Sequence, residues 1–315
     1  MTPNTPAAGC LLDDFELNLS PQIRITGKYV TPPRTSLSPK SVPLLVGIHG
    51  GTLTSSYYNV DSDYSAAKFA TAFGIPFVAL DRPCYNGSTS ILPLEDGDSF
   101  FQKTARRLDE DILPAIWQKF GIPTGCTGIV TLNHSMAVPI AIVTASLHAK
   151  REEQLYPLRG MIISGFGSQW ADPEELRSPP GAQLPTEIEY PRDTKKKLML
   201  SANHFNTHDP EIEKYSDPLS VPMPVEELLD LLVHWPTYGS DSAAEVVIPV
   251  MYALGEHDFL WVANRRTLND FGAIFTKCQR FDASVVLGAP HAIEWSKARA
   301  GWYNRCFSWA MEICS

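Results

Sequence analysis

The sequence lacks several features that would point to other classes of protein. No apolar run approaches the ~18 residues that a membrane-spanning helix needs, so we expect no membrane span. The 35 Asp and Glu residues outnumber the 26 Lys and Arg residues. The resulting net charge of −9 argues against nucleic acid as a partner, because nucleic-acid-binding proteins present a basic face. The first residues also lack the basic and apolar regions of a secretory signal.

Paired cysteines are missing as well. The six cysteines are scattered, without Cys-x-x-Cys pairs or the spacing of zinc ligands, and we interpret them as reduced. His204 and His208 are four residues apart, like two metal ligands on a helix, but no third ligand is evident. The pattern favours a structural or solvent-facing role for both histidines. We therefore expect a cytoplasmic protein with no metal and no cofactor.

Apolar stretches of strand length alternate with helical stretches over much of the chain. Strands are expected at residues 44–48, 76–80, 129–132, 160–165, 246–254 and 283–287. Helices are expected near residues 65–73, 99–120 and 136–149. This alternation is typical of an α/β fold, in which a mostly parallel twisted sheet is flanked by helices. Residues 15–19 and 22–30 predict an antiparallel hairpin at the sheet edge.

The alternation stops between residues 166 and 243, where prolines are frequent and no buried strand is evident. Within this segment, residues 224–235 predict an amphipathic helix, with Val225, Leu228, Leu229, Leu231 and Leu232 near helical spacing. The lysine run at 195–197 is typical of a solvated face. We divide the chain into a core, residues 1–165 and 244–315, and an inserted segment, residues 166–243. The inserted segment is expected to be a lid (cap) that covers the site.

Ser135 stands where an apolar strand runs directly into a helix. A sharp strand-to-helix turn would lift its hydroxyl above the sheet, beside the free N–H groups of the helix N-terminus. Such a serine can act as a nucleophile. Asn133 and Ala137 occupy the two flanking positions where glycine is usual. Both are tolerable, because Asn accepts left-handed backbone and Ala is small.

Two partners for the serine follow in the chain. Asp258 comes just after the strand expected at 246–254, and His291 lies on the loop after the strand at 283–287. The order is therefore nucleophile, acid, base, which suits a Ser-His-Asp triad. Glu256 and Glu294 are alternative acids only if the loop geometry is unusual.

Consecutive glycines follow an earlier strand in the chain. The strand at 44–48 runs into His49, Gly50 and Gly51, where backbone N–H groups can approach a ligand without side-chain obstruction. We predict that the N–H groups of Gly51 and Met136 form an oxyanion hole.

Together these stretches resemble the α/β-hydrolase superfamily over nearly the whole chain. The resemblance is carried by residues 49–51, 80–83, 255–258 and 288–291 and by the turn at Ser135. More narrowly, residues 49–52 followed by 55–58 are similar to fungal hydrolases of secondary-metabolite and toxin pathways. That similarity implies a hydrophobic, polyketide-like acyl substrate. The residues expected to contact it are Gly50, Thr52, Tyr57, Tyr58, Trp170, Trp235 and Trp261.

The predicted activity is hydrolysis of an ester, thioester or lactone through an acyl-enzyme, with a bulky hydrophobic small molecule as the partner. The same triad also supports C–C bond hydrolysis or acyl-transfer cyclisation. A ligand receptor without turnover on the same fold is a further alternative. A homodimer is compatible with the sequence, which does not fix the oligomeric state.

Overall fold

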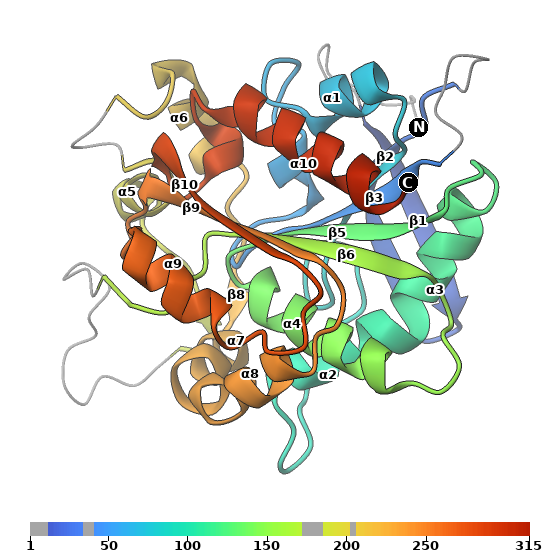
Figure 1. Ribbon diagram of the computed structural model, residues 1–315. Helices are drawn as coiled ribbons and strands as arrows, with labels where there is room; N and C mark the ends of the chain where they lie inside the picture. Colours follow the sequence, from blue (N-terminus) through green and yellow to red (C-terminus); the bar gives the residue numbers. More distant parts are fainter. Residues whose placement is uncertain (1–11, 34–40, 172–184, 202–205) are drawn as a thin grey trace, which may run out of the picture.

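The computed structural model describes residues 12–33, 41–171, 185–201 and 206–315. Its main sheet has eight strands in the order β1-β2-β4-β3-β5-β6-β9-β10 (Figure 1). The β1–β2 and β2–β4 pairs are antiparallel, and the remaining neighbours are parallel. The strands are β1 (Asp13–Ser20), β2 (Ile23–Val30), β3 (Pro43–Ile48), β4 (Phe77–Leu80), β5 (Gly128–His134), β6 (Leu158–Ser164), β9 (Val250–His257) and β10 (Phe281–Pro290).

Helices cover both faces of this sheet. In Figure 1, α1 (Ala66–Phe73) and α10 (Arg299–Ile313) lie above it, whereas α2 (Phe100–Arg107), α3 (Leu113–Ile116) and α4 (Ala137–Lys150) lie below. Helix α9 (Arg265–Gly272) packs on β10. The predicted α/β class, a mostly parallel sheet flanked by helices, is confirmed.

Local chemistry explains where several elements begin and bend. The Ser65 side chain accepts from the Ala67 N–H and caps α1. The helix expected at 99–120 is continuous to Gly121, but π-helical turns occupy Leu108–Ile112 and Trp117–Gly121 on either side of α3. Because α3 contains Pro114, which lacks an N–H, the regular hydrogen-bond ladder cannot continue through it.

The strand expected at 246–254 begins and ends later than predicted. Strand β9 starts at Val250, because Pro249 cannot donate to a neighbouring strand, and it continues to His257. Asp258 consequently follows the last strand residue directly.

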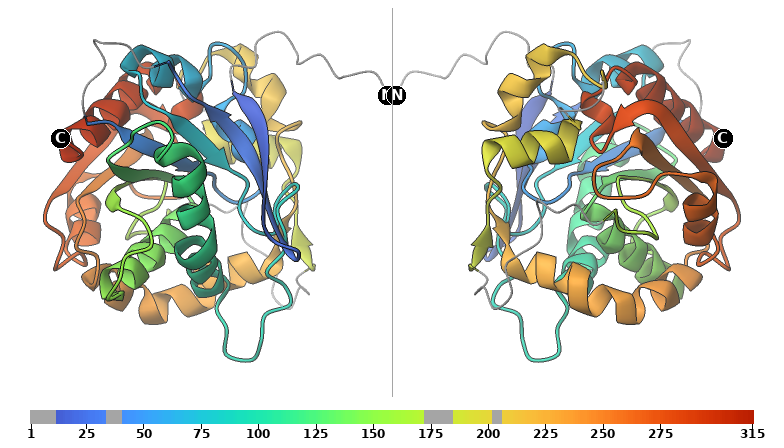
Figure 2. Two further views of the ribbon diagram at one scale, coloured as in Figure 1. Left: turned by 90° about the vertical axis from the view of Figure 1, so that its right-hand side faces the viewer. Right: turned by 90° about the vertical axis from the view of Figure 1, so that its left-hand side faces the viewer.

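The inserted segment wraps around one side and the bottom of the molecule, as the yellow to orange part of Figure 2 shows. Its elements are β7 (Glu187–Ile188), α5 (Arg192–Leu200), α6 (Glu213–Ser216), β8 (Met223–Pro224), α7 (Val225–Leu229) and α8 (Trp235–Ala244). Short 3-10 helices are Pro210–Ile212 in this segment and Ser55–Tyr58 and Ile293–Trp295 in the core. The division of the chain at residues 165 and 243 stays a prediction.

Two expectations about the inserted segment hold only in part. The helix predicted at 224–235 exists, as α7 and a π-helical turn at Asp230–His234, but its most buried side chains are Glu227 and Asp230. Leu232 instead is 57% exposed. The lysine run does not form a solvated face either, because Lys195 is only 1% exposed. In both cases buried polar side chains of the segment form hydrogen bonds or ion pairs with the core.

None of the helices in the described part of the chain has the length and apolar character that crossing a bilayer requires.

Candidate active site

Ser135 occupies a strained turn between β5 and α4. Its φ of 54° lies in the left-handed region, which non-glycine residues rarely adopt. The turn is held from both sides: the Ser135 N–H donates to the Ser164 carbonyl at 2.8 Å, and the Ser135 carbonyl accepts from the Val138 N–H at 2.8 Å. The hydroxyl therefore stands at the carboxyl ends of the parallel strands, and Met136 is the N-cap of α4.

Asn133 supports this turn through its side chain and not, as expected, through a left-handed backbone. It lies within β5 and does not carry the left-handed backbone, which falls on Ser135. Its side-chain amide donates to Thr131 Oγ1 at 2.9 Å and to the Ile162 carbonyl at 3.0 Å. Asn133 thus ties β5 to β6 immediately below the turn.

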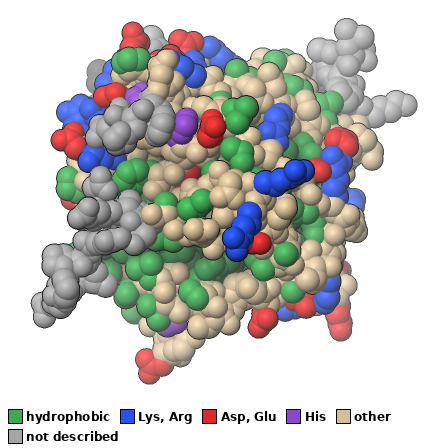
Figure 3. All heavy atoms as spheres, turned by 60° about the vertical axis from the view of Figure 1, so that its left-hand side comes forward, with side chains coloured by type: hydrophobic (Ala, Val, Ile, Leu, Met, Phe, Trp, Pro, Cys, Tyr) green, Lys and Arg blue, Asp and Glu red, His purple; other side chains and the backbone are tan. Residues whose placement is uncertain are grey.

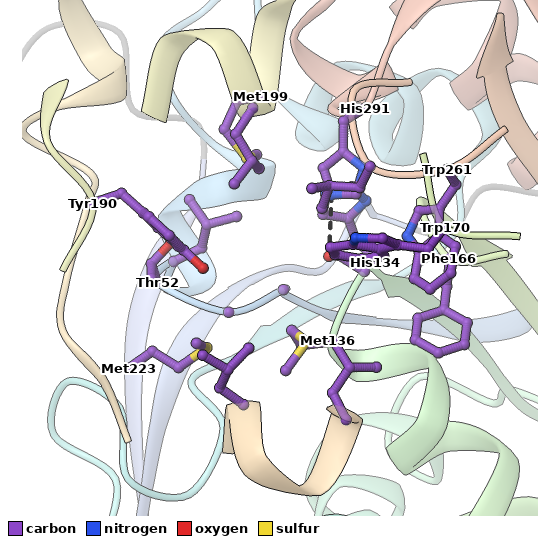
Figure 4. A pocket seen from close by; sticks show the side chains of 18 residues that line it. Thr52, His134, Met136, Phe166, Trp170, Tyr190, Met199, Met223, Trp261 and His291 are labelled. Atoms are coloured by element: carbon purple, nitrogen blue, oxygen red, sulfur yellow. Dashed lines mark hydrogen bonds between the residues drawn. The ribbon is translucent and has the colours of Figure 1, made fainter. Parts of the chain in front are cut away.

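Ser135, His291 and Asp258 form one hydrogen-bonded chain. The distance from His291 Nε2 to Ser135 Oγ is 3.1 Å, and the dashed line in Figure 4 marks this bond. On the other side of the ring, His291 Nδ1 lies 2.9 Å from Asp258 Oδ2 and 3.0 Å from Oδ1. Both the imidazole and the carboxylate are buried.

The Asp258 carboxylate is held in place by backbone donors. Its Oδ1 accepts from the N–H groups of Leu260 at 2.8 Å and Trp261 at 3.1 Å. The two competing carboxylates face other groups. Glu256 accepts from the Gly288 N–H, and Glu294 accepts from Tyr57 at 2.6 Å and Trp302 at 2.9 Å. Asp258 is therefore the carboxylate that this geometry pairs with His291.

The ring of His134, the residue before the serine, packs against Tyr57 and His291. Its ring stacks on Tyr57 at a centroid distance of 4.8 Å and lies 4.8 Å from the ring of His291. Burial, with the nearby His291, lowers the pKa of His134 well below its usual range. Gly165 makes room for both rings: its φ is +66°, and a Cβ there would lie 2.7 Å from His134 and 3.0 Å from His291.

The loop after β3, residues 49–52, approaches the serine closely. A Cβ on Gly50 would lie 3.0 Å from the Cβ of Ser135, and one on Gly51 would lie 2.6 Å from the sulfur of Met223. Any other residue would force neighbouring groups apart. Thr52 continues the loop in the left-handed region, with φ of 58°. We call residues 49–52 the glycine loop.

A buried ion pair holds the first half of the glycine loop. Arg82 Nη2 donates to the Gly50 carbonyl at 3.0 Å and pairs with Glu227 Oε1 at 2.8 Å. The Arg82 backbone N–H donates to His49 Nε2 at 3.1 Å, so His49 Nδ1 carries the proton and donates to the Gly50 carbonyl at 2.8 Å. Burial and the charge of Arg82 lower the pKa of His49 well below its usual range, which agrees with this neutral tautomer.

A small, mostly apolar cavity of about 50 Å³ lies beside Ser135 and His291. It is lined by the glycine loop and by the inserted segment, which contributes Phe166, Trp170, Tyr190, Leu198, Met199, Met223, Leu228 and Leu231. In Figure 4, Phe166, Trp170 and Trp261 gather on one side of His291, and Thr52, Tyr190 and Met223 lie on the other.

Four of the seven residues expected to contact a substrate line this cavity: Gly50, Thr52, Trp170 and Trp261. Tyr57 and Tyr58 do not, and the expectation for them is wrong. Both are fully buried beneath the site. The Tyr57 hydroxyl donates to Glu294, and the Tyr58 hydroxyl donates to the carbonyls of Ile48 and Leu132.

Trp235 lines a larger neighbouring groove of about 410 Å³ instead. This groove shares four wall residues with the cavity beside Ser135, namely Phe166, Trp170, Leu231 and Trp261. In Figure 3, hydrophobic side chains gather in the lower left part of the face that turns toward the viewer.

No group of metal-binding side chains is found among the described residues. His208 contacts Thr207 Oγ1 at 2.9 Å and Glu213 Oε1 at 3.1 Å. His204 lies outside the described residues.

Known structures superimpose on nearly the whole chain. A candidate lipase from Acinetobacter baumannii has a TM-score of 0.63 at 14% identity, covering 96% of this chain and 92% of its own. Est1E from Butyrivibrio proteoclasticus, whose structure contains ferulic acid, has a TM-score of 0.58 at 12% identity, covering 95% and 98%. A thioesterase domain from the curacin biosynthetic pathway has a TM-score of 0.56 at 12% identity, covering 93% and 98%.

The protein has the α/β-hydrolase fold. At these identities the likeness concerns the fold alone. No protein-family model matches the chain, and no curated protein is similar to it in sequence. The narrower resemblance to fungal hydrolases of secondary metabolism therefore stays a prediction.

Sequence reasoning missed three buried charged residues around the glycine loop: Arg82, Lys195 and Glu227. A weak signal exists for one of them. Lys195, Leu198 and Met199 share helical spacing, and the last two line the cavity, so the first also faces the core. For Arg82 and Glu227 no signal was available, because the two partners lie far apart in the chain.

Proposed function

We propose that this protein is a serine hydrolase that cleaves an ester, thioester or lactone of a bulky hydrophobic substrate through an acyl-enzyme. One observation carries the proposal: the hydrogen-bonded chain from Ser135 through His291 to Asp258 at a strained strand-to-helix turn. A serine hydroxyl is a weak nucleophile by itself, and an adjacent oriented base is what activates it.

Each member of the chain has a role that follows from its contacts. His291 Nε2 accepts the Ser135 proton as Oγ attacks the acyl carbonyl, and later returns a proton to the leaving group. Asp258 accepts from Nδ1 of His291, which keeps Nε2 free to act as the base and stabilises the imidazolium that forms. The two backbone N–H groups on Asp258 Oδ1 keep the carboxylate in this orientation.

The N–H groups of Gly51 and Met136 are the proposed oxyanion donors. Gly51 lies in the glycine loop, and Met136 begins α4, where the N–H groups and the helix dipole favour negative charge. A further set of hydrogen bonds strengthens the Gly51 N–H as a donor. The carbonyl of the same peptide unit, that of Gly50, accepts from Arg82 and His49, and this polarises the unit.

The two apolar spaces suggest how a large substrate is held. The cavity beside Ser135, about 50 Å³, has room for a small group near the reacting carbonyl. The groove behind the shared aromatic wall, about 410 Å³, has room for a much larger apolar part. A hydrophobic, polyketide-like acyl compound would bury its extended part against Trp170, Trp235 and Trp261.

The test is labelling with a fluorophosphonate probe, which reacts with an activated serine. The wild type should be labelled at Ser135 and should turn over a hydrophobic p-nitrophenyl ester. Ser135→Ala should lose both activities and keep its thermal unfolding temperature. Ser284→Ala, which removes a hydroxyl that contacts Arg305, is the control and should behave like the wild type.

Labelling that persists in Ser135→Ala would show that the nucleophile is another residue. Tight binding of hydrophobic acyl compounds without turnover would favour a receptor on this fold. Product analysis of a turned-over substrate by mass spectrometry then separates hydrolysis of an ester, thioester or lactone from C–C cleavage and from cyclisation.

A further inference from the structure

Lys195 on α5 is a buried cation that no carboxylate among the described residues compensates. Its side chain reaches the glycine loop, where Nζ donates to the Thr52 carbonyl at 3.2 Å and also to the Thr52 hydroxyl. Within the residues that the structure describes, no carboxylate forms an ion pair with it. Removing an ammonium group from water costs several kcal/mol when no charge compensates it. A residue this costly to bury requires a specific explanation.

The contact with Thr52 is part of a larger arrangement around Gly51. On one side, the Gly50 carbonyl accepts from Arg82, which pairs with Glu227 of the inserted segment. On the other side, the Thr52 carbonyl accepts from Lys195 and from the Val221 N–H at 3.1 Å, both from the inserted segment. The carbonyls that flank Gly51 are therefore both held by buried cations.

Thr52 needs such support because its backbone is strained. A non-glycine residue in the left-handed region costs of the order of 1–3 kcal/mol and persists only where its surroundings impose it. If Thr52 relaxed, the peptide unit between Gly51 and Thr52 would rotate. This rotation would displace Gly51, whose N–H belongs to the preceding peptide unit, and so change the direction of that N–H.

We propose that Lys195, in its protonated form, is a positioning residue that holds Thr52 in its left-handed conformation and thereby aims the Gly51 N–H at the oxyanion. This inference rests on the proposed function. Lys195 acts through Thr52, and its positive charge beside the glycine loop also favours the negative charge that develops during attack.

Protonation of Lys195 is sensitive to pH in the neutral range. Burial lowers the pKa of Lys195 to about 7. The titratable groups that face it from the core are His49 and His134, whose own pKa values are lowered mainly by burial. Arg82 is paired with Glu227, and Lys196 on the same helix is paired with Glu213. None of these groups supplies a negative charge that would keep Lys195 protonated above neutral pH.

The experiment compares Lys195→Met with the wild type across about pH 6 to 9, using a p-nitrophenyl ester of a hydrophobic acid. Met replaces the charge with a side chain of similar volume. At pH 6 the variant should have a kcat roughly tenfold lower, as expected for the loss of a hydrogen bond to a charged group, with little change in KM. The ratio of wild-type to variant kcat should fall toward one by pH 9, because wild-type Lys195 is then neutral.

Lys196→Met is the matched control, because Lys196 neighbours Lys195 but pairs with Glu213 at 3.0 Å. Its kcat should follow the wild type at every pH. Lys195→Arg provides a rescue, since its charge persists at high pH. If this variant unfolds at the wild-type temperature, its kcat at pH 9 should exceed that of the wild type.

A ratio of wild-type to Lys195→Met kcat that does not change with pH would overturn the inference, because a purely structural role has no reason to titrate. An effect confined to KM would overturn it as well. The proposed function fails by a different result, namely the absence of fluorophosphonate labelling at Ser135 in the wild type. The two failures are therefore distinguishable in the same set of samples.

Discussion

The sheet core and the inserted segment are held by different kinds of contact. In the centre of the sheet, β3 is buried along its whole length by apolar side chains. The inserted segment also packs apolar side chains on the core, but it adds buried charged groups that bond to core residues: Lys195, Glu227 and Asp230. Apolar packing tolerates small shifts, whereas hydrogen bonds have fixed lengths and directions. The difference indicates that the inserted segment is placed accurately relative to the glycine loop.

Asp230 illustrates this point away from the site. Its Oδ2 accepts from the Phe101 N–H at 2.6 Å and from the Ser99 hydroxyl, and its Oδ1 accepts from Tyr238 at 3.0 Å. Phe101 lies in the first turn of α2, where N–H groups lack partners within the helix. A carboxylate of the inserted segment thus caps a helix of the core, and a negative charge is favoured there by the helix dipole.

The largest loss of activity is expected for a substitution in the core. Asp258→Asn should lower kcat by roughly 10⁴-fold, because the amide stabilises the wrong tautomer of His291. The unfolding temperature should change little, since the shape of the side chain is kept. Steady-state kinetics measure the loss, and Glu256→Gln, whose parent side chain faces the Gly288 N–H, is the control. Equal losses in the two variants would contradict the assignment of Asp258.

Breaking the ion pair between core and inserted segment should mainly reduce stability. Glu227→Gln leaves the charge of Arg82 buried without compensation, and we expect the free energy of unfolding to fall by about 3–5 kcal/mol in urea titrations. Glu187→Gln, at an exposed carboxylate of β7 in the same segment, should change stability by less than about 0.5 kcal/mol. Arg82→Met combined with Glu227→Leu should recover much of the loss. A double variant less stable than Glu227→Gln would argue that the pair itself stabilises the fold.

The stability of the Lys195→Met variant should depend on pH with a definite sign. The unfolded chain keeps Lys195 protonated until about pH 10, whereas the folded protein has a pKa of about 7 at this residue. Between these values the unfolded state binds one more proton, so wild-type stability rises with pH there by up to ~1.4 kcal/mol per unit. The variant should therefore be more stable than the wild type below pH 7, with an advantage that shrinks above it. A constant difference would show that Lys195 does not titrate in this range.

The smallest change in activity is expected for a substitution at the outer wall of the groove that Trp235 lines. Leu232→Ser should lower kcat/KM for long-chain acyl esters by about threefold relative to acetyl esters. The expected effect is small because Leu232 stands at the rim of the groove, where a substrate buries less apolar surface than one methylene group provides. Stability should be unaffected. Val233→Ser is the matched control, since Val233 is 55% exposed and does not line the groove. If both variants have the same acyl preference as the wild type, the groove takes no part in substrate binding.

Much of the fold follows from local patterns in the sequence. Strand-length apolar runs such as residues 44–48, and the run of β-type residues into Ser135, depend on neighbours within a few positions. They predicted the alternation of strands and helices and the loops on which Ser135, Asp258 and His291 lie. The carboxyl ends of parallel strands meet at one edge, so residues that directly follow such strands are brought near one another.

Sequence by itself therefore determined the α/β class, the strand-to-helix turn and the order of Ser135, Asp258 and His291. Only the tertiary structure decided which polar residues are buried and with what partners. Tyr57 meets Glu294 across 237 positions of the chain, and Lys195 meets Thr52 across 143. Local periodicity carries no information about such pairs, because a buried charge is stabilised by groups that the fold alone brings within hydrogen-bond distance.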